Sequence, residues 1–193
     1  MSMSSKIMVG IGASDYIRTQ TVGMLIGLFR KYPDMKLAIK QSPYIHDNRE
    51  QVVDEFLKTD YTHLFFVDSD MLFGPEVLDY LLKQDKDIIG CQYNKRMGKE
   101  GVSVAPSRYD LEGMSAPNHP FINQVIATGC LLIKREVFSR IPKPWFSMGT
   151  PENWLGEDVY FSKKARENGV QVFLDDTQKI GHIGEYVYWR NNK

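Results

Sequence analysis

Two aspartates, one residue apart, follow an apolar stretch in "LFFVDSDMLF", where residues 64–67 have the composition of a buried strand. In an extended chain, side chains at i and i+2 point the same way, with Cα atoms about 6.5–7 Å apart. The carboxylates of Asp68 and Asp70 can therefore address one cation, and clustered oxygen ligands suit Mg²⁺ or Mn²⁺. Alternatively, the two aspartates shape a turn or help to begin the next helix.

A second acidic pair, Glu157 and Asp158, begins a helical pattern in "LGEDVYF". A carboxylate beside a hydroxyl group can take its proton while a new bond forms. Acidic residues are also common in the first turn of a helix, where they contribute up to about 1 kcal/mol. The residues alone leave both interpretations open. His182 follows the last predicted strand, and its imidazole is an acceptable Mn²⁺ ligand.

The elements that must position these residues alternate between strand-like and helical patterns over the first 93 residues. Strands are expected at 6–13, 35–41, 62–68 and 86–93, and later at 170–176, with a strand-to-helix pattern at 124–138. This order predicts an α/β fold, with a mainly parallel twisted sheet flanked by helices and a small antiparallel or loop region. The first helix is expected to present Val22, Leu25, Ile26 and Phe29 as its apolar face. Ligands of such sheets bind beyond the carboxyl ends of the strands, where Asp68 is expected.

Length and charge limit the classes of function. A chain of 193 residues fits one domain with a sizeable core. Its 24 basic and 24 acidic residues give a net charge of +0, which argues against nucleic-acid binding. No apolar run approaches the roughly 20 residues of a membrane span, and no signal peptide is recognised, so a soluble cytoplasmic protein is expected. Cys91 and Cys130 fit reduced core positions.

The region 62–93, followed by "IATGCLLIKREVF" and "GEDVYF", resembles the GT-A fold glycosyltransferases, in particular family-2-like members. The resemblance covers roughly residues 6–183, and the compact chain is similar to small stand-alone viral or bacterial enzymes. It implies a single glycosyltransferase domain over 1–193, with a nucleotide-binding half at about 6–93 and an acceptor and catalytic half at about 94–193. It implies metal-dependent transfer of a sugar from a nucleoside-diphosphate sugar to a hydroxyl of a glycan or other acceptor. By family frequency the donor is a UDP-sugar, and the preferred outcome is inversion. Whether the protein forms an oligomer is left open.

The resemblance also implies roles for individual residues. Asp70 is expected to hold Mn²⁺ or Mg²⁺, Asp68 to share that cation with the ribose, and His182 to complete the ligands. Asp158 is the expected base, with Glu157 as the alternative or as an acceptor-binding group. The nucleotide-binding residues expected from the resemblance are Ala13, Ser14, Arg49, Asp68, Ser69, Asp70 and Arg96.

Two other classes of function fit parts of the sequence. A haloacid-dehalogenase-like phosphatase would use Asp68 as its nucleophile, but that family usually continues with Gly-Thr and carries the motif on its first strand. Here Met71 and Leu72 follow, and two βα units come before. The other alternative is a sugar-nucleotide-binding module that transfers nothing.

Overall fold

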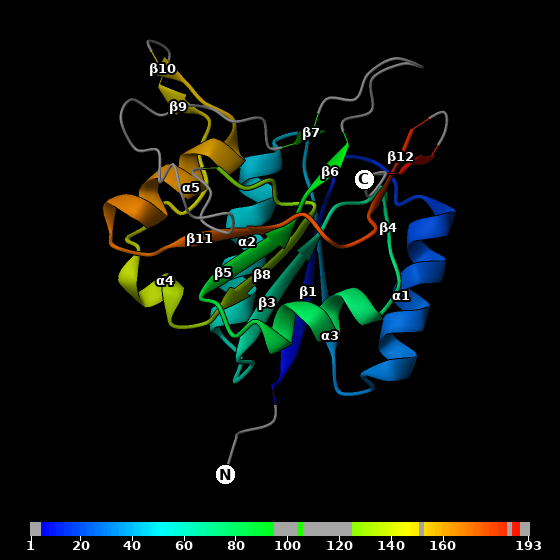
Figure 1. Ribbon diagram of the computed structural model, residues 1–193. Helices are drawn as coiled ribbons and strands as arrows, with labels where there is room; N and C mark the ends of the chain where they lie inside the picture. Colours follow the sequence, from blue (N-terminus) through cyan, green and yellow to red (C-terminus); the bar gives the residue numbers. More distant parts are fainter. Residues whose placement is uncertain (1–4, 95–103, 106–124, 151–152, 185–186, 190–193) are drawn as a thin grey trace.

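The computed structural model describes residues 5–94, 104–105, 125–150, 153–184 and 187–189, and has the expected α/β architecture (Figure 1). In chain order the elements are β1 (Ile7–Ala13), α1 (Thr19–Lys31), β2 (Lys36–Gln41), α2 (Ile45–Leu57), β3 (His63–Val67), β4 (Met71–Leu72), α3 (Glu76–Lys83), β5 (Ile88–Cys91), β6 (Tyr93–Asn94), β7 (Val104–Ala105), β8 (Cys130–Lys134), α4 (Val137–Arg140), β9 (Gly149–Thr150), β10 (Asn153–Trp154), α5 (Glu157–Glu167), β11 (Val172–Asp175), β12 (Gly181–Ile183) and β13 (Val187–Trp189).

Six described strands form the main sheet in the order β11-β5-β8-β3-β1-β2. The pairings β1–β2, β1–β3 and β5–β11 are parallel, whereas β8 runs antiparallel to both of its neighbours, β3 and β5. A smaller sheet contains β13, β12 and β4, and β4 is the short strand that follows the Asp68–Asp70 turn. The prediction of a mainly parallel sheet with a small antiparallel region is confirmed.

Helices cover both faces of the main sheet because its central strands are apolar on both sides (Figure 1). One described core cluster joins α1 and α3 to one face, and the other joins α2, α4 and α5 to the opposite face. Cys91 and Cys130 are buried free thiols, as predicted. No helix among the described residues combines the length and apolar character needed to cross a membrane.

The apolar face predicted for α1 is partly wrong. Of its residues, Leu25 is buried, but Val22 and Ile26 are 41% and 49% exposed. The buried positions of the helix are Thr21, Met24, Leu25 and Leu28. Helix α1 carries apolar residues around most of its circumference, so the periodicity of apolar residues is compatible with two different buried faces. The helix packs against the sheet with the face that was not predicted.

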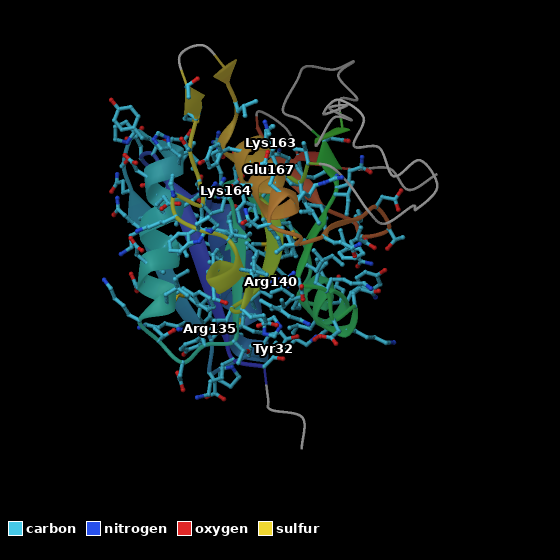
Figure 2. The ribbon with its side chains drawn as sticks, turned by 90° about the vertical axis from the view of Figure 1, so that its left-hand side faces the viewer. Tyr32, Arg135, Arg140, Lys163, Lys164 and Glu167 are labelled. Atoms are coloured by element: carbon cyan, nitrogen blue, oxygen red, sulfur yellow. The ribbon has the colours of Figure 1, made fainter. Side chains whose placement is uncertain are left out.

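Helix α2, which carries Arg49, is held against the sheet at two places. Gly10 on β1 lets α2 approach closely, since a Cβ at this position would lie 2.4 Å from Val52 Cγ1. At the end of α2, the Arg135 guanidinium donates hydrogen bonds to the carbonyl oxygens of Phe56, Leu57 and Tyr61, which satisfies the end of the helix. Arg135 lies at the lower end of the molecule, far from the carboxyl end of β1 (Figure 2).

Candidate functional site

A cavity of about 310 Å³ lies beyond the carboxyl ends of β1 and β3, beside the first turns of α2 and α5. This is the edge at which open α/β sheets bind ligands. The described residues that line it are Gly12, Ser14, Ser42, Pro43, Ile45, Asn48, Arg49, Asp68, Ser69, Asp70, Glu157 and His182. One hollow thus brings together most of the site residues expected from the sequence.

The chain turns at Asp68 instead of remaining extended, which corrects the expected i, i+2 geometry. The Met71 amide donates a hydrogen bond to the Asp68 carbonyl oxygen at 3.3 Å, so residues 68–71 form a turn between β3 and β4. The two carboxylates consequently meet different partners. Asp68 pairs with Arg49, whereas Asp70 faces His182.

Arg49 connects two carboxylates from distant parts of the chain. Its Nη2 lies 2.9 Å from Asp68 Oδ1 and its Nε lies 3.3 Å from Glu157 Oε1. The Arg49 side chain is 2% exposed and packs over the Phe66 ring. Burial alone would lower the pKa of Arg49, but the charges of Asp68 and Glu157 outweigh burial and raise it. The guanidinium is therefore a permanent cation in the wall of the cavity.

Strand pairing brings His182 to Asp70. β12 runs antiparallel to β4, and the Ile183 amide donates a hydrogen bond to the Asp70 carbonyl oxygen at 2.7 Å. His182 Nε2 then lies 3.4 Å from Asp70 Oδ1. On the other side of the ring, His182 Nδ1 lies 2.8 Å from the Asn94 carbonyl oxygen. Because a carbonyl oxygen can only accept, Nδ1 must carry a proton, and in the neutral ring Nε2 presents its lone pair towards Asp70.

These two side chains are suited to hold a divalent cation. Metal-binding histidines commonly donate their second ring N–H to a backbone carbonyl, as His182 does to Asn94. The described residues contain no group of three or more His, Cys, Asp or Glu side chains placed to hold a metal ion. Asp70 and His182 are therefore a two-residue set, which suits Mg²⁺ or Mn²⁺ sites completed by water and substrate phosphates.

The two acidic residues of α5 differ in their surroundings. Glu157 lines the cavity and bonds to Arg49. Asp158 Oδ1 accepts a hydrogen bond from the Val159 amide at 2.7 Å. Burial, followed by the neighbouring charge of Glu157, raises the pKa of Asp158 above its ordinary 3.8. Asp158 thus has the higher proton affinity expected of a group that works as a base.

Asn48 lines the cavity from α2. Its Nδ2 donates to the carbonyl oxygens of Ala13 and Ser42, at 3.2 and 3.1 Å. This fixes the orientation of the amide, and Asn48 Oδ1 is left buried without a protein partner, as is Nη1 of Arg49. Unpaired buried polar atoms are costly, so each of these two atoms would gain a hydrogen bond from a ligand that reaches it.

Most of the predicted site residues line the cavity, but Asp158 and Ala13 are not among its lining residues. Ala13 is buried, and contributes its carbonyl oxygen to Asn48. Arg96 lies outside the described residues, so its expected role stays a prediction. The sequence analysis missed Tyr93 and Gly129. The Gly129 amide donates to Tyr93 Oη at 3.1 Å, and a Cβ on Gly129 would lie 2.9 Å from Asp68 Oδ2. The glycine in "ATGC", residues 127–130, is the sequence feature that could have indicated this close approach.

Comparisons with known proteins support the fold. No family model matches the chain, and no curated protein matches it. Among solved structures, A197 from STIV aligns with a TM-score of 0.66 and 21% identity, covering 97% of this chain and 95% of A197. An inositol-1-phosphate CTP transferase from T. maritima aligns with a TM-score of 0.49 and 15% identity, covering 93% and 89% of the two chains. A CMP:2-keto-3-deoxy-manno-octonic acid synthetase complexed with CTP gives 0.49 and 11%, covering 94% of each chain. Of these three, the alignment with A197 is close enough to establish a shared fold.

Proposed function

We propose that this protein is a metal-dependent glycosyltransferase of the GT-A type, which transfers a sugar from a nucleoside-diphosphate sugar to a hydroxyl group. The observation that carries this proposal is the composition of the cavity at the carboxyl ends of β1 and β3. It combines the Asp70–His182 pair, the unpaired polar atoms of Asn48 and Arg49, and the acidic first turn of α5. A donor with a nucleoside, a diphosphate and a reactive sugar needs these three environments.

Asp70 and His182 would hold Mn²⁺ or Mg²⁺, which when bound stabilises the negative charge on the departing diphosphate. The backbone carbonyl of Asn94 keeps His182 in the orientation that this role requires. Asp70 is 8% exposed, and its carboxylate is fixed at the end of β3 by the pairing of β4 with β12.

The nucleoside is expected at the end formed by Gly12, Ser14 and Asn48. Asn48 Oδ1 would accept a hydrogen bond from a base N–H or a ribose hydroxyl, and Arg49 Nη1 would donate one. Gly12 lets the start of α2 lie close to β1, since a Cβ there would lie 3.1 Å from atoms of both Ile45 and Asn48. A UDP-sugar is the proposed donor, with Ser69 and Arg96 as further nucleotide contacts.

Asp158 is the proposed base, and takes the proton of the attacking hydroxyl as the glycosidic bond forms with inversion. Arg49 bonds to the Glu157 carboxylate, whereas burial raises the pKa of Asp158. Glu157 then orients Arg49 or the acceptor. A glycan or another hydroxyl compound is the proposed acceptor.

The test is a thermal-shift panel of UDP, GDP, CMP and TDP, each with and without Mn²⁺, followed by donor hydrolysis with the best nucleotide. One nucleotide should stabilise the protein, more strongly with Mn²⁺, and its sugar ester should be hydrolysed slowly. The proposal fails if no nucleotide stabilises the protein. Binding without turnover of any donor would favour a non-catalytic module, and hydrolysis of a simple phosphomonoester that Asp68→Asn abolishes would favour a phosphatase.

A further inference from the structure

Among the described residues, the cavity wall has more acidic than basic side chains, and their arrangement bears on metal binding. Among the described residues that line it, Asp68, Asp70 and Glu157 carry carboxylates, whereas Arg49 supplies the single Lys or Arg side chain. Arg49 is buried, and an arginine in a protein does not lose its proton. The site therefore contains a fixed cation before any ligand binds.

The Arg49 guanidinium forms ion pairs with two of these three carboxylates. Asp68 Oδ1 accepts from Arg49 Nη2, and Glu157 Oε1 accepts from Arg49 Nε. The other Asp68 oxygen, Oδ2, faces Gly129, where a Cβ would lie 2.9 Å away. A metal that used Asp68 would have to compete with a charge-assisted hydrogen bond and to approach the positive charge of Arg49.

Asp70 is arranged differently from Asp68. Its carboxylate faces His182, whose Nδ1 bonds to the Asn94 carbonyl oxygen and not to an acidic side chain. Two protein ligands hold Mg²⁺ or Mn²⁺ weakly unless other oxygens complete the shell, and nucleotide sites commonly use substrate phosphates for this.

We propose that Arg49 withholds Asp68 and Glu157 from the divalent cation, so that Asp70 and His182 are its protein ligands and firm metal binding requires the nucleotide diphosphate. This inference rests on the proposed function and deepens it. It assigns Arg49 to set the order of binding, with metal and nucleotide entering together. It also gives the two aspartates different partners, since Asp70 binds the metal and Asp68 pairs with Arg49.

The first test is a Mn²⁺ titration of the protein without nucleotide, with free Mn²⁺ measured by electron paramagnetic resonance. Asp68→Asn keeps the shape of the side chain, and its Mn²⁺ dissociation constant should stay within about twofold of the wild type, because Asp68 is not a ligand. Asp70→Asn should weaken binding about tenfold or more, since one of two ligands is lost. If Asp68→Asn weakens Mn²⁺ binding as much as Asp70→Asn does, the inference is overturned.

The second test removes the fixed cation. Arg49→Gln should tighten Mn²⁺ binding without nucleotide by about tenfold, because Asp68 and Glu157 become available and a repulsive charge is lost. The advantage that UDP gives to Mn²⁺ binding should shrink accordingly. The control is Lys40→Gln, which removes a positive charge from an ion pair with Glu55, at 2.6 Å, outside the cavity. It should change neither Mn²⁺ binding without nucleotide nor the advantage that UDP gives to Mn²⁺ binding. Unchanged or weaker Mn²⁺ binding by folded Arg49→Gln contradicts the inference.

Loss of the buried Arg49 side chain could prevent folding, and the Asp68→Asn titration then decides alone. Failure of the inference and failure of the proposed function are distinguishable. A wild-type protein that binds no Mn²⁺ even with UDP contradicts the metal-dependent function. A wild-type protein that binds Mn²⁺ and UDP together, but loses Mn²⁺ binding in Asp68→Asn, retains the function and contradicts the role given to Arg49.

Discussion

His182 Nε2 lies 3.4 Å from Asp70 Oδ1, although the two residues belong to strands far apart in the sequence. The contact exists because β4, which directly follows the Asp68–Asp70 turn, pairs with β12. Replacing either residue should therefore have a measurable effect on Mn²⁺ binding.

Replacement of His182 by Gln should abolish the additional thermal stabilisation that Mn²⁺ gives to the nucleotide complex. Glutamine fills similar space, but does not supply the imidazole lone pair aimed at Asp70. The measurement is the Mn²⁺-dependent shift in melting temperature with UDP. His46→Gln is the matched control, because His46 also lies near a carboxylate, Asp47 at 3.5 Å, but does not line the cavity. An undiminished Mn²⁺ effect in His182→Gln would argue against ligation.

Asp158→Asn should retain nucleotide binding and lose sugar transfer by about 10²–10⁴-fold, the usual contribution of a positioned base. The comparison is between the dissociation constant for UDP with Mn²⁺ and the kcat for transfer. Glu167→Gln serves as control. Glu167 lies on the outer side of the same helix beside Lys163, as Figure 2 shows, and should leave both values unchanged. Equal losses in binding and in kcat would not fit a base.

The rate of transfer should fall at low pH, with a midpoint above 3.8, because burial and Glu157 raise the pKa of Asp158 and a base must be ionised. Glu157→Gln removes one cause of the shift and should move the midpoint to lower pH. A pH–rate profile of kcat measures both. For stability the sign is reversed, since the contribution of a carboxyl with a raised folded-state pKa is present at low pH and is lost as the pH rises through that value. A midpoint unaffected by Glu157→Gln would argue against the charge of Glu157 as a cause of the shift, and a midpoint unaffected by Asp158→Glu would argue against Asp158 as the titrating group.

Gly129→Ala should impair the site without a charge change. The added Cβ would lie 2.5 Å from Tyr93 Oη and 2.9 Å from Asp68 Oδ2, so Tyr93, Asp68 or the start of β8 must move. We expect a lower melting temperature, by several degrees, and weaker nucleotide binding. Gly27→Ala is the control, because nothing lies within 4 Å of a Cβ there, and alanine in a helix should stabilise the protein by about 0.5–1 kcal/mol. If Gly129→Ala and Gly27→Ala have the same melting temperature and the same affinity for the nucleotide, a Cβ can be accommodated at Gly129.

The strands of the sheet could be predicted from the sequence because local composition determines them. Strands such as β1 and β3 are apolar on both faces and are bounded by polar residues. The position of Asp68 at the end of a central strand followed from the same pattern. The antiparallel direction of β8 did not, since a run of apolar residues has no direction.

The geometry of the site depends on contacts that spacing along the chain does not reveal. Arg49 and Glu157 are 108 residues apart, and their ion pair requires α2 and α5 to meet on the same face of the sheet. The contact between Asp70 and His182 follows from the pairing of β4 with β12, which a local pattern does not contain. Residue types were therefore predictable as candidates, whereas their partners were not.

The central place of β8 has a consequence for the order in which the protein can assemble during synthesis. β3 and β5 do not pair with each other, and β8 joins them. A nascent chain that has not yet released β8 from the ribosome exposes unpaired edges on both strands, which is the condition that favours contact with other chains. The carboxyl end of β3 gains its Gly129 neighbour when β8 is inserted. Insertion of β8 is thus a late step in folding of the sheet, and chaperones that protect strand edges should act on this protein before residue 134 has emerged.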